Sequence, residues 1–409
     1  MLIARDRVTI AALATFFVVV QFYTSFAALS PTPPVGYVFA SRAGAAVLVA
    51  LLALSAIACA VRLVQDRAPL PAPSRATLVA WIGSALLASV LGLDPWSGLQ
   101  VVAVMLLCAA FHVALVRYYA LPGAARTLLG AYLWTGLAAS LAALVMLALR
   151  SPAALYSYNH GRAAGVFVTA NQCAAYSVVL AYTALGVALS ANGRLRVLAI
   201  CTSLAAFVTL AATFSQAGVL GAAAAAIFFA LASGARRSAA GLAAVLALGV
   251  IVLALRPVGG HDPADTFDRL RTWRSGIRVA ELFPLTGVGP MAYWRVYPAV
   301  RPPNSDPPGT FGALHPHDAY ISLAGETGIV GVAAAGYGWW RIGGAIRAAW
   351  RRRSPRERAL SIGICAGLCA ALVQGIFDTI GIVQMCFVWI PTTALALAAA
   401  EYGLPKARV

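Results

Sequence analysis

The sequence predicts an all-α protein that crosses a membrane many times. Hydrophobic residues make up 61% of the 409 residues and charged residues only 11%, so the chain has more apolar surface than one soluble core can bury. The apolar residues gather in runs of roughly 18 or more, which is the length of a transmembrane helix. One segment, 256–318, is long and polar. We therefore expect about 12 transmembrane helices with a long loop between the ninth and the tenth.

Each expected span is a run of mainly apolar residues. The first follows Arg5 and Arg7 and is too long for the apolar region of a signal peptide, so we expect it to be retained. The expected spans are 8–30, 43–61, 76–93, 101–116, 127–149, 166–191, 197–214, 218–235, 238–255, 320–340, 359–377 and 385–400. The chain then divides into spans 1–9 (residues 1–255), the long loop (256–318), and spans 10–12 with a basic cytoplasmic loop (319–409).

The basic residues predict the orientation of these spans. The net charge of +17 does not indicate nucleic-acid binding, because most basic residues lie in short segments between apolar runs. With the N-terminus in the cytoplasm, 20 of the 30 basic residues are cytoplasmic, as the positive-inside rule expects. Most of the others lie in two external segments, 150–165 and 256–318. An anionic ligand would explain why they are kept there.

The long loop contains an expected amphipathic helix over 269–282, with Asp265, Thr266 or Asp268 as its N-cap. Such a helix lies in the membrane interface with its guanidinium groups along the surface. Those groups bind either a phosphorylated substrate or anionic lipid headgroups. Its apolar stripe consists of Leu270, Trp273 and Ile277, and the adjacent basic face of Arg271, Arg274 and Arg278.

Metal binding has weak support in the sequence. Asp262, Asp265 and Asp268 are spaced by three, and carboxylates at this spacing could hold Mg²⁺ or Ca²⁺. Capping of the expected helix and pairing with nearby arginines explain the same residues. The seven cysteines lie in or beside apolar runs without zinc-type spacing. We therefore expect neither a metal nor another cofactor.

His315 and His317 stand at the end of the long loop, just before the tenth expected span. Imidazole exchanges protons most readily near neutral pH, so His317 is a candidate general base. The alternative is a pair of interfacial histidines without a chemical role. Glu326 lies well inside the tenth span, where a carboxylate often marks a functional site. We expect it to hold the loop or to pair with an arginine rather than to take part in the chemistry.

Four segments between Arg162 and Gly331 carry motifs. They are Arg162 to Phe167 with Asn171 and Ala174; Ala212 to Gly218; Arg269 to Trp273 followed by Pro284 to Pro290; and His317-Asp318 followed, after nine residues, by Gly328 to Gly331. In this order they resemble the bacterial O-antigen ligase and polymerase family, with its RxxGxFxxxN, TxSRgg and hPLxGvGp patterns and a His-Asn pair ahead of Gly-x-x-Gly. Two positions depart from the family pattern: Gln216 replaces an arginine, and Asp318 replaces an asparagine.

The resemblance implies a GT-C-like glycosyltransferase of the bacterial inner membrane, with both termini in the cytoplasm and the active site on the periplasmic side. The implied donor is a glycan on undecaprenyl pyrophosphate. The implied acceptor is lipid A core, a growing polysaccharide or a protein side chain. Membrane lipids are the remaining expected partners, and nucleic acid is not one.

The resemblance also implies roles for particular residues. His317 takes the proton from the acceptor hydroxyl, while arginines stabilise the departing pyrophosphate, because a guanidinium donates two hydrogen bonds and carries a fixed charge. The residues expected to hold the pyrophosphate or the glycan are Arg162, Arg269, Arg274, Asn171, His315 and Glu326.

Three other interpretations remain open from the sequence. A polymerase of the same family shares these motifs with a ligase. A transporter or flippase also fits about 12 spans, but it predicts internal repeats and polar residues near the middle of the membrane, and few are present. A non-catalytic scaffold fits the composition and leaves the histidines and external arginines unexplained.

Overall fold

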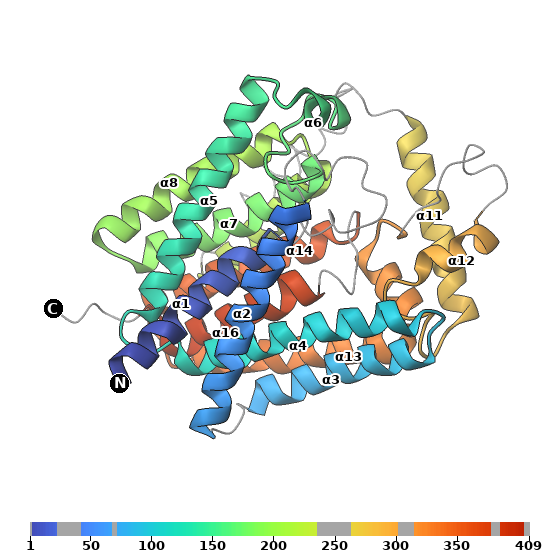
Figure 1. Ribbon diagram of the computed structural model, residues 1–409. Helices are drawn as coiled ribbons and strands as arrows, with labels where there is room; N and C mark the ends of the chain where they lie inside the picture. Colours follow the sequence, from blue (N-terminus) through green and yellow to red (C-terminus); the bar gives the residue numbers. More distant parts are fainter. Residues whose placement is uncertain are drawn as a thin grey trace.

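The computed structural model describes residues 2–22, 42–67, 72–234, 263–301, 315–377 and 385–404, and the regular secondary structure among them is entirely helical (Figure 1). Eight of these helices are long and apolar enough to cross a membrane. The predicted all-α, multi-pass membrane fold is therefore confirmed. The predicted count of 12 spans is not confirmed, and the ninth expected span, 238–255, lies outside the described residues.

The eight candidate spans are α2 (Arg42–Asp66), α3 (Ala72–Leu91), α4 (Pro95–Tyr118), α5 (Ala124–Ala148), α7 (Ala170–Ser190), α8 (Gly193–Ala212), α13 (Ala319–Trp350) and α14 (Pro355–Gln374). The other described helices are α1 (Leu2–Val20), α6 (Ala153–Tyr158), α9 (Gln216–Ala232), α11 (Pro263–Leu282), α12 (Tyr293–Val300), the π-helix η3 (Met385–Trp389) and α16 (Ile390–Tyr402).

Several predicted boundaries are wrong, among them those of α1, α13 and α11. Helix α1 ends at Val20 rather than near residue 30. Helix α13 continues past residue 340 to Trp350, because its last turns carry arginines but no proline before Pro355. Helix α11 begins at Pro263, so Asp265, Thr266 and Asp268 lie inside it rather than capping it. Proline is favoured at the first helical position, where its missing N–H would have no partner.

Helix α14 lies at the centre of the bundle, against α7, α9 and α16. Small residues bring these backbones close together, as in many membrane helices. A Cβ atom at Gly186 of α7 would lie 2.8 Å from the carbonyl oxygen of Ala359, and one at Gly221 of α9 would lie 2.8 Å from that of Ala370. The alanine- and glycine-rich spans are therefore packing surfaces.

Helices α3, α4 and α13 form the other side of the bundle, with α13 against α3 and α3 against α4 (Figure 1). A buried histidine joins this side to α16. His112 of α4 donates from Nδ1 to the carbonyl oxygen of Ile390 at 3.0 Å, and its Nε2 accepts from the Ser74 hydroxyl at 3.0 Å. Because both ring nitrogens have protein partners, His112 stabilises the contact between helices.

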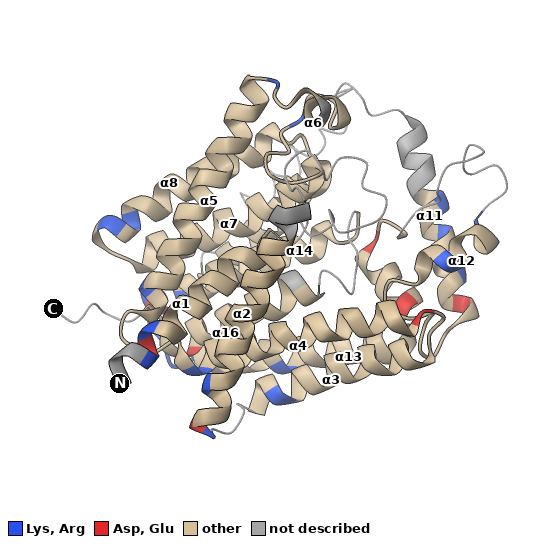
Figure 2. Cartoon of the chain, viewed as in Figure 1, with Lys and Arg blue, Asp and Glu red and all other residues tan. Residues whose placement is uncertain are grey.

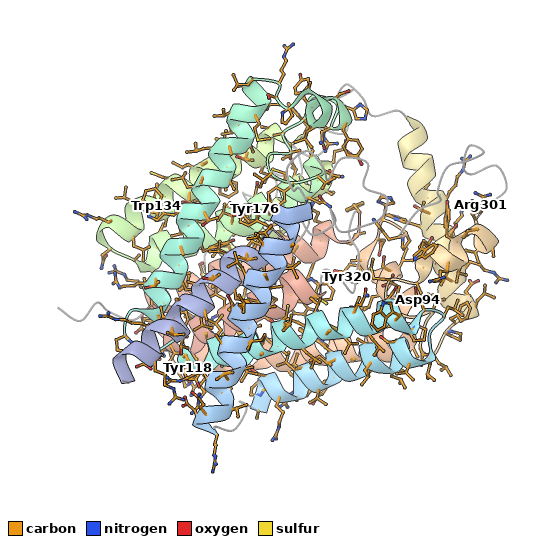
Figure 3. The ribbon with its side chains drawn as sticks, in the orientation of Figure 1. Asp94, Tyr118, Trp134, Tyr176, Arg301 and Tyr320 are labelled. Carbon is orange, nitrogen blue, oxygen red and sulfur yellow. The ribbon has the colours of Figure 1, made fainter. Side chains whose placement is uncertain are left out.

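Charged residues lie at two ends of the bundle (Figure 2). At one end, Asp66 at the end of α2 pairs with Arg5 at 2.7 Å and with Arg62 at 3.0 Å, and it accepts a hydrogen bond from the Tyr118 hydroxyl. At the other end lie α11, α12 and the turn that contains Asp94. Figure 3 shows Tyr118 and Asp94 at these opposite ends.

The segment 283–291, called here the 283–291 loop, enters a break in α13. Gly328 has φ 60° and ψ −166°, which interrupts the helix. The loop supplies backbone partners at the break: Val288 N–H donates to the Gly325 carbonyl at 2.9 Å, and Ile329 N–H donates to the Pro284 carbonyl at 2.9 Å. The Pro284 to Pro290 motif segment and the Gly-x-x-Gly motif are therefore two halves of one structure.

Two carboxylates hold the end of this loop. Glu326 of α13 is buried and accepts a hydrogen bond from the backbone N–H of Met291. Asp94 accepts from Arg295 Nη2 at 2.7 Å and Nε at 3.0 Å, and the hydrogen bonds from Arg295 lower the pKa of Asp94. The position of Glu326 agrees with the expectation that it holds the loop.

Candidate active site

Arg162 lies in a polar cluster that joins the first two motif segments. Its Nε donates to the carbonyl oxygen of Thr213 at 2.7 Å, and its Nη2 donates to Asn171 Oδ1 at 2.9 Å. The Ser215 hydroxyl donates to the same Asn171 oxygen at 2.9 Å. Asn171 therefore holds the guanidinium of Arg162 and the N-cap residue of α9 through a single atom.

The cluster lies at the beginning of two long helices. Asn171 is in the first turn of α7, and Ser215 caps α9 by accepting from Gly218 N–H at 3.2 Å. The beginning of a helix carries a partial positive charge and attracts anions. Two such helix ends and the Arg162 guanidinium therefore make this region electropositive.

Gln374 connects the cluster to the His317 segment. Its side-chain amide donates to the carbonyl oxygen of Asn171 at 2.9 Å. The carbonyl oxygen of the next residue, Gly375, accepts from Ala319 N–H at 2.7 Å, and the Tyr320 hydroxyl donates to the Leu372 carbonyl at 2.8 Å. The end of α14 thus lies between the Arg162 cluster and the beginning of α13.

His317 stands in a strained turn before α13. Its φ is 55°, a left-handed value that few side chains other than Asn, Asp and His adopt. Its N–H donates to His315 Nδ1 at 3.2 Å, the two imidazole rings lie 4.4 Å apart, and its carbonyl oxygen accepts from Trp273 Nε1 at 3.4 Å. The contacts with His315 and Trp273 hold the turn, and the His317 side chain is partly exposed.

Asp318 is the N-cap of α13. One of its carboxylate oxygens accepts from the N–H groups of Tyr320 and Ile321, both at 2.8 Å. Burial raises the pKa of Asp318, and these two backbone hydrogen bonds oppose the rise. Asparagine has the same shape and offers the same carbonyl acceptor, so the departure from the family pattern at this position preserves the cap.

Helix α11 carries three exposed arginines among its described side chains. Arg271, Arg274 and Arg278 are exposed, whereas Ser275 and Val279 are buried on the face toward α13. Leu270 and Ile277 of the predicted apolar stripe are also exposed, and Trp273 turns toward His317. Arg278 pairs with Glu281 at 3.0 Å.

Arg269 and Gln216 are not part of the Arg162 cluster as the structure describes it. The backbone of Arg269 lies in α11, and its side chain is outside the described part of the structure. Gln216, in the place of a family arginine, is the first residue of α9 and is exposed beside Ser215.

Sequence reasoning missed four residues that this region uses. Ser215 and Gln374 join separate motif segments, and the Asp94–Arg295 pair anchors the loop that enters α13. A signal was present for Gln374, because an uncharged polar residue near the end of an apolar span needs hydrogen-bond partners.

Among the described side chains, no group of three or more His, Cys, Asp or Glu is arranged to hold a metal ion. The side chains of Asp262, Asp265 and Asp268, the sequence candidates for a metal site, lie outside the described residues.

Comparison with known families assigns the central part of the chain. Residues 201–336 match the family model described as O-antigen ligase. The match includes the Ala212 to Gly218 segment, α11 and the His317 turn, whereas Arg162 and Asn171 precede it. A search of curated proteins found no similar sequence. The family match confirms the resemblance for residues 201–336 of this multi-pass membrane protein, which are similar to the O-antigen ligase family.

Proposed function

We propose that this protein is a glycosyltransferase that moves a glycan from undecaprenyl pyrophosphate to an acceptor hydroxyl of lipid A core or a growing polysaccharide. The observation that carries the proposal is the connection from His317 to Arg162. Ala319, two residues after His317, bonds to Gly375 at the end of α14, and Gln374 bonds to Asn171, which holds Arg162. A proton acceptor and a cationic cluster therefore belong to one end of the bundle.

The chemistry follows from these groups. His317 accepts the proton of the acceptor hydroxyl while the oxygen attacks the anomeric carbon, and the bond from that carbon to the pyrophosphate oxygen breaks. The pyrophosphate leaves with both electrons, and Arg162, Arg269 and Arg274 stabilise its negative charge. Attack from the face opposite the leaving group inverts the configuration of the sugar.

The remaining candidate residues position these groups. Asn171 orients the guanidinium of Arg162 through its Oδ1. His315 holds the backbone of the His317 turn and offers its ring to the glycan. Glu326 fixes the 283–291 loop, which connects α11 and its arginines to α12.

The proposed setting is the bacterial inner membrane, with both termini in the cytoplasm and the active site on the periplasmic side. Contacts near the two termini support the proposal that both lie on the same side of the membrane. Tyr118 at the end of α4 bonds to Asp66 beside Arg5 of α1, while Arg352, just after α13, pairs with Glu401 of α16. The proposed division is 1–255, 256–318 and 319–409, with the periplasmic loop in the middle part.

Asn171→Asp tests whether the charge of Arg162 acts on the pyrophosphate. The aspartate keeps an oxygen acceptor for both Arg162 and Ser215, so the fold is retained, but it neutralises the guanidinium. We expect the KM for the lipid-linked donor to rise about tenfold, because a charge-assisted contact to phosphate contributes about 1.5–3 kcal/mol. Steady-state kinetics with purified protein measure it. A KM equal to that of wild type would assign Arg162 a purely structural role.

Arg269→Lys tests the geometry of the basic helix. Lysine keeps the charge but cannot make the two parallel hydrogen bonds of a guanidinium, so we expect donor turnover to fall about tenfold or more. Arg278→Lys is the matched control, because Arg278 lies on the same helix and already pairs with Glu281. Equal turnover by Arg269→Lys and wild type would reduce Arg269 to an electrostatic anchor.

Consumption of the lipid-linked donor by purified protein is the experiment that tests the proposed activity. Turnover with an acceptor and none without it is the expected result. A transporter or a scaffold would leave the donor intact, and that outcome would overturn the proposal.

Ligase and polymerase are separated by the glycans of a deletion strain. On a gel of surface polysaccharide, loss of attachment with free polymer retained indicates a ligase. Single repeat units on the surface indicate a polymerase, the second candidate, which the same family match supports.

A further inference from the structure

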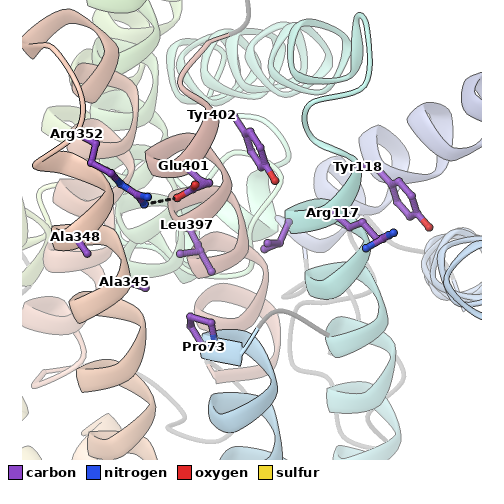
Figure 4. Close-up of a pocket in the computed structure, with 10 residues that line it drawn as sticks. Pro73, Arg117, Tyr118, Ala345, Ala348, Arg352, Leu397, Glu401 and Tyr402 are labelled. Atoms are coloured by element: carbon purple, nitrogen blue, oxygen red, sulfur yellow. Dashed lines mark hydrogen bonds and ion pairs between the residues drawn. The ribbon is translucent and has the colours of Figure 1, made fainter. Parts of the chain in front are cut away.

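A cavity of about 650 Å³ lies where α4 and α13 end and α3 begins (Figure 4). Helix α13 begins at Ala319, two residues after His317, and ends at Trp350, two residues before Arg352 in the cavity wall. At 1.5 Å per residue this separation is roughly 45 Å. The cavity is therefore distinct from the proposed active site.

The walls of this cavity change from charged to apolar along its depth. Arg352 stands just beyond the last turn of α13, whereas Ala345, seven residues earlier, lies roughly 10 Å deeper along the same helix. Helices α4, α13 and α16 and the beginning of α3 supply the walls. The polar part consists of Arg117, Tyr118, Arg352, Glu401 and Tyr402, and the apolar part of Pro73, Val116, Ala345, Ala348 and Leu397.

The charges of the polar part favour an anion. Two arginines and one glutamate line it. Arg352 pairs with Glu401 at 3.1 Å, but the two side chains are 67% and 45% exposed, and an exposed pair of this kind contributes little stability. Arg352 can therefore exchange Glu401 for a phosphate at small cost, and Arg117 adds positive charge to the lining of the cavity.

We propose that this cavity binds an anionic phospholipid. The phosphate pairs with Arg352, Arg117 of α4 adds positive charge at the same cavity, and an acyl chain follows Val116, Ala345 and Leu397 toward the hydrocarbon region. Basic pockets between transmembrane helices have the chemistry to bind such headgroups. A free phosphate would leave the apolar walls uncovered, and the polyprenyl donor reacts at the opposite end of the molecule.

The proposal is tested with purified full-length protein in detergent, by native mass spectrometry and by thermal unfolding with added lipid. Phosphatidylglycerol is expected to bind and to raise the unfolding temperature, and phosphatidylcholine of the same acyl length to do so much less, because it lacks net charge. Arg117→Gln and Arg352→Gln are each expected to weaken phosphatidylglycerol binding about fivefold.

Two further variants make the result specific to the cavity. Arg347→Gln removes a charge from the same end of α13, but its side chain is not part of the wall, so binding should equal that of wild type. Ala348→Trp fills the cavity without changing charge and should weaken binding as much as the arginine variants. The proposal would be overturned if Arg347→Gln lost as much phosphatidylglycerol binding as the cavity variants, or if Ala348→Trp lost none, because the lipid would then only follow the surface charge. Equal binding of phosphatidylcholine and phosphatidylglycerol would also overturn it. Stronger binding of polyprenyl phosphate than of phosphatidylglycerol would also overturn it.

Discussion

Replacing His317 with asparagine will abolish glycan transfer while the protein still accumulates in the membrane. A positioned base contributes about 10² to 10⁴-fold in rate, and asparagine cannot accept the proton. Asparagine is preferred to alanine here, because it tolerates the left-handed backbone at φ 55° and leaves the turn before α13 intact. Surface glycan in a complemented deletion strain and donor turnover by purified protein both measure the effect.

His160→Asn is the matched control for this experiment. His160 is exposed and also has a left-handed backbone, with φ 51°, so the substitution makes the same chemical change in a comparable conformation. Its activity should equal that of wild type. Wild-type turnover in His317→Asn would remove His317 as the base, and equal losses in the two variants would point to a general effect of histidine replacement.

Gly287→Ala will prevent the 283–291 loop from entering α13 and will deplete the folded protein. Gly287 has φ 67°, and a Cβ there would lie 2.2 Å from the carbonyl carbon of Glu326 and 2.4 Å from the nitrogen of Thr327. Both are backbone atoms and cannot move aside as a side chain would. We expect a cost of about 3 kcal/mol or more, from overpacking and from the left-handed backbone together.

Gly336→Ala, on α13, is the control for Gly287→Ala. A Cβ at Gly336 meets nothing within 4 Å, and alanine in a helix interior is favoured by up to about 1 kcal/mol over glycine. Membrane accumulation and thermal unfolding of the two variants measure the difference. If Gly287→Ala were as stable as Gly336→Ala, the contact between the loop and the α13 break would not be a requirement of the fold.

In the candidate site, the sequence motifs identified the segments but not the contacts between them. The sequence placed Arg162 and Asn171 in one segment and Ser215 in another, and the resemblance grouped these segments. It did not indicate that Asn171 Oδ1 accepts from both Arg162 and Ser215, because residues 44 positions apart meet only through the packing of α7 against α9. Gln374 is uncharged and lies at the end of an apolar run, so the sequence does not show that it bonds to Asn171.

The break in α13 could not be predicted from the sequence either, because it lies within one continuous apolar run. Glycine is frequent in membrane helices as a packing residue, so Gly328 by itself indicates no interruption. Its left-handed conformation arises because the 283–291 loop provides hydrogen-bond partners for the backbone there. Glu326 contributes to the same contact because its carboxylate accepts a hydrogen bond from the backbone N–H of Met291.

Composition and apolar run length were enough to establish a multi-pass helical membrane protein, because burial of a span depends on its own residues and on the thickness of the bilayer. Ordered motifs were enough to indicate its family. The tertiary structure alone decided that α14 joins the Arg162 cluster to the His317 turn, and that the 283–291 loop enters the break in α13. Those relations depend on hydrogen bonds between distant residues, whose partners and directions exist only once the helices have packed.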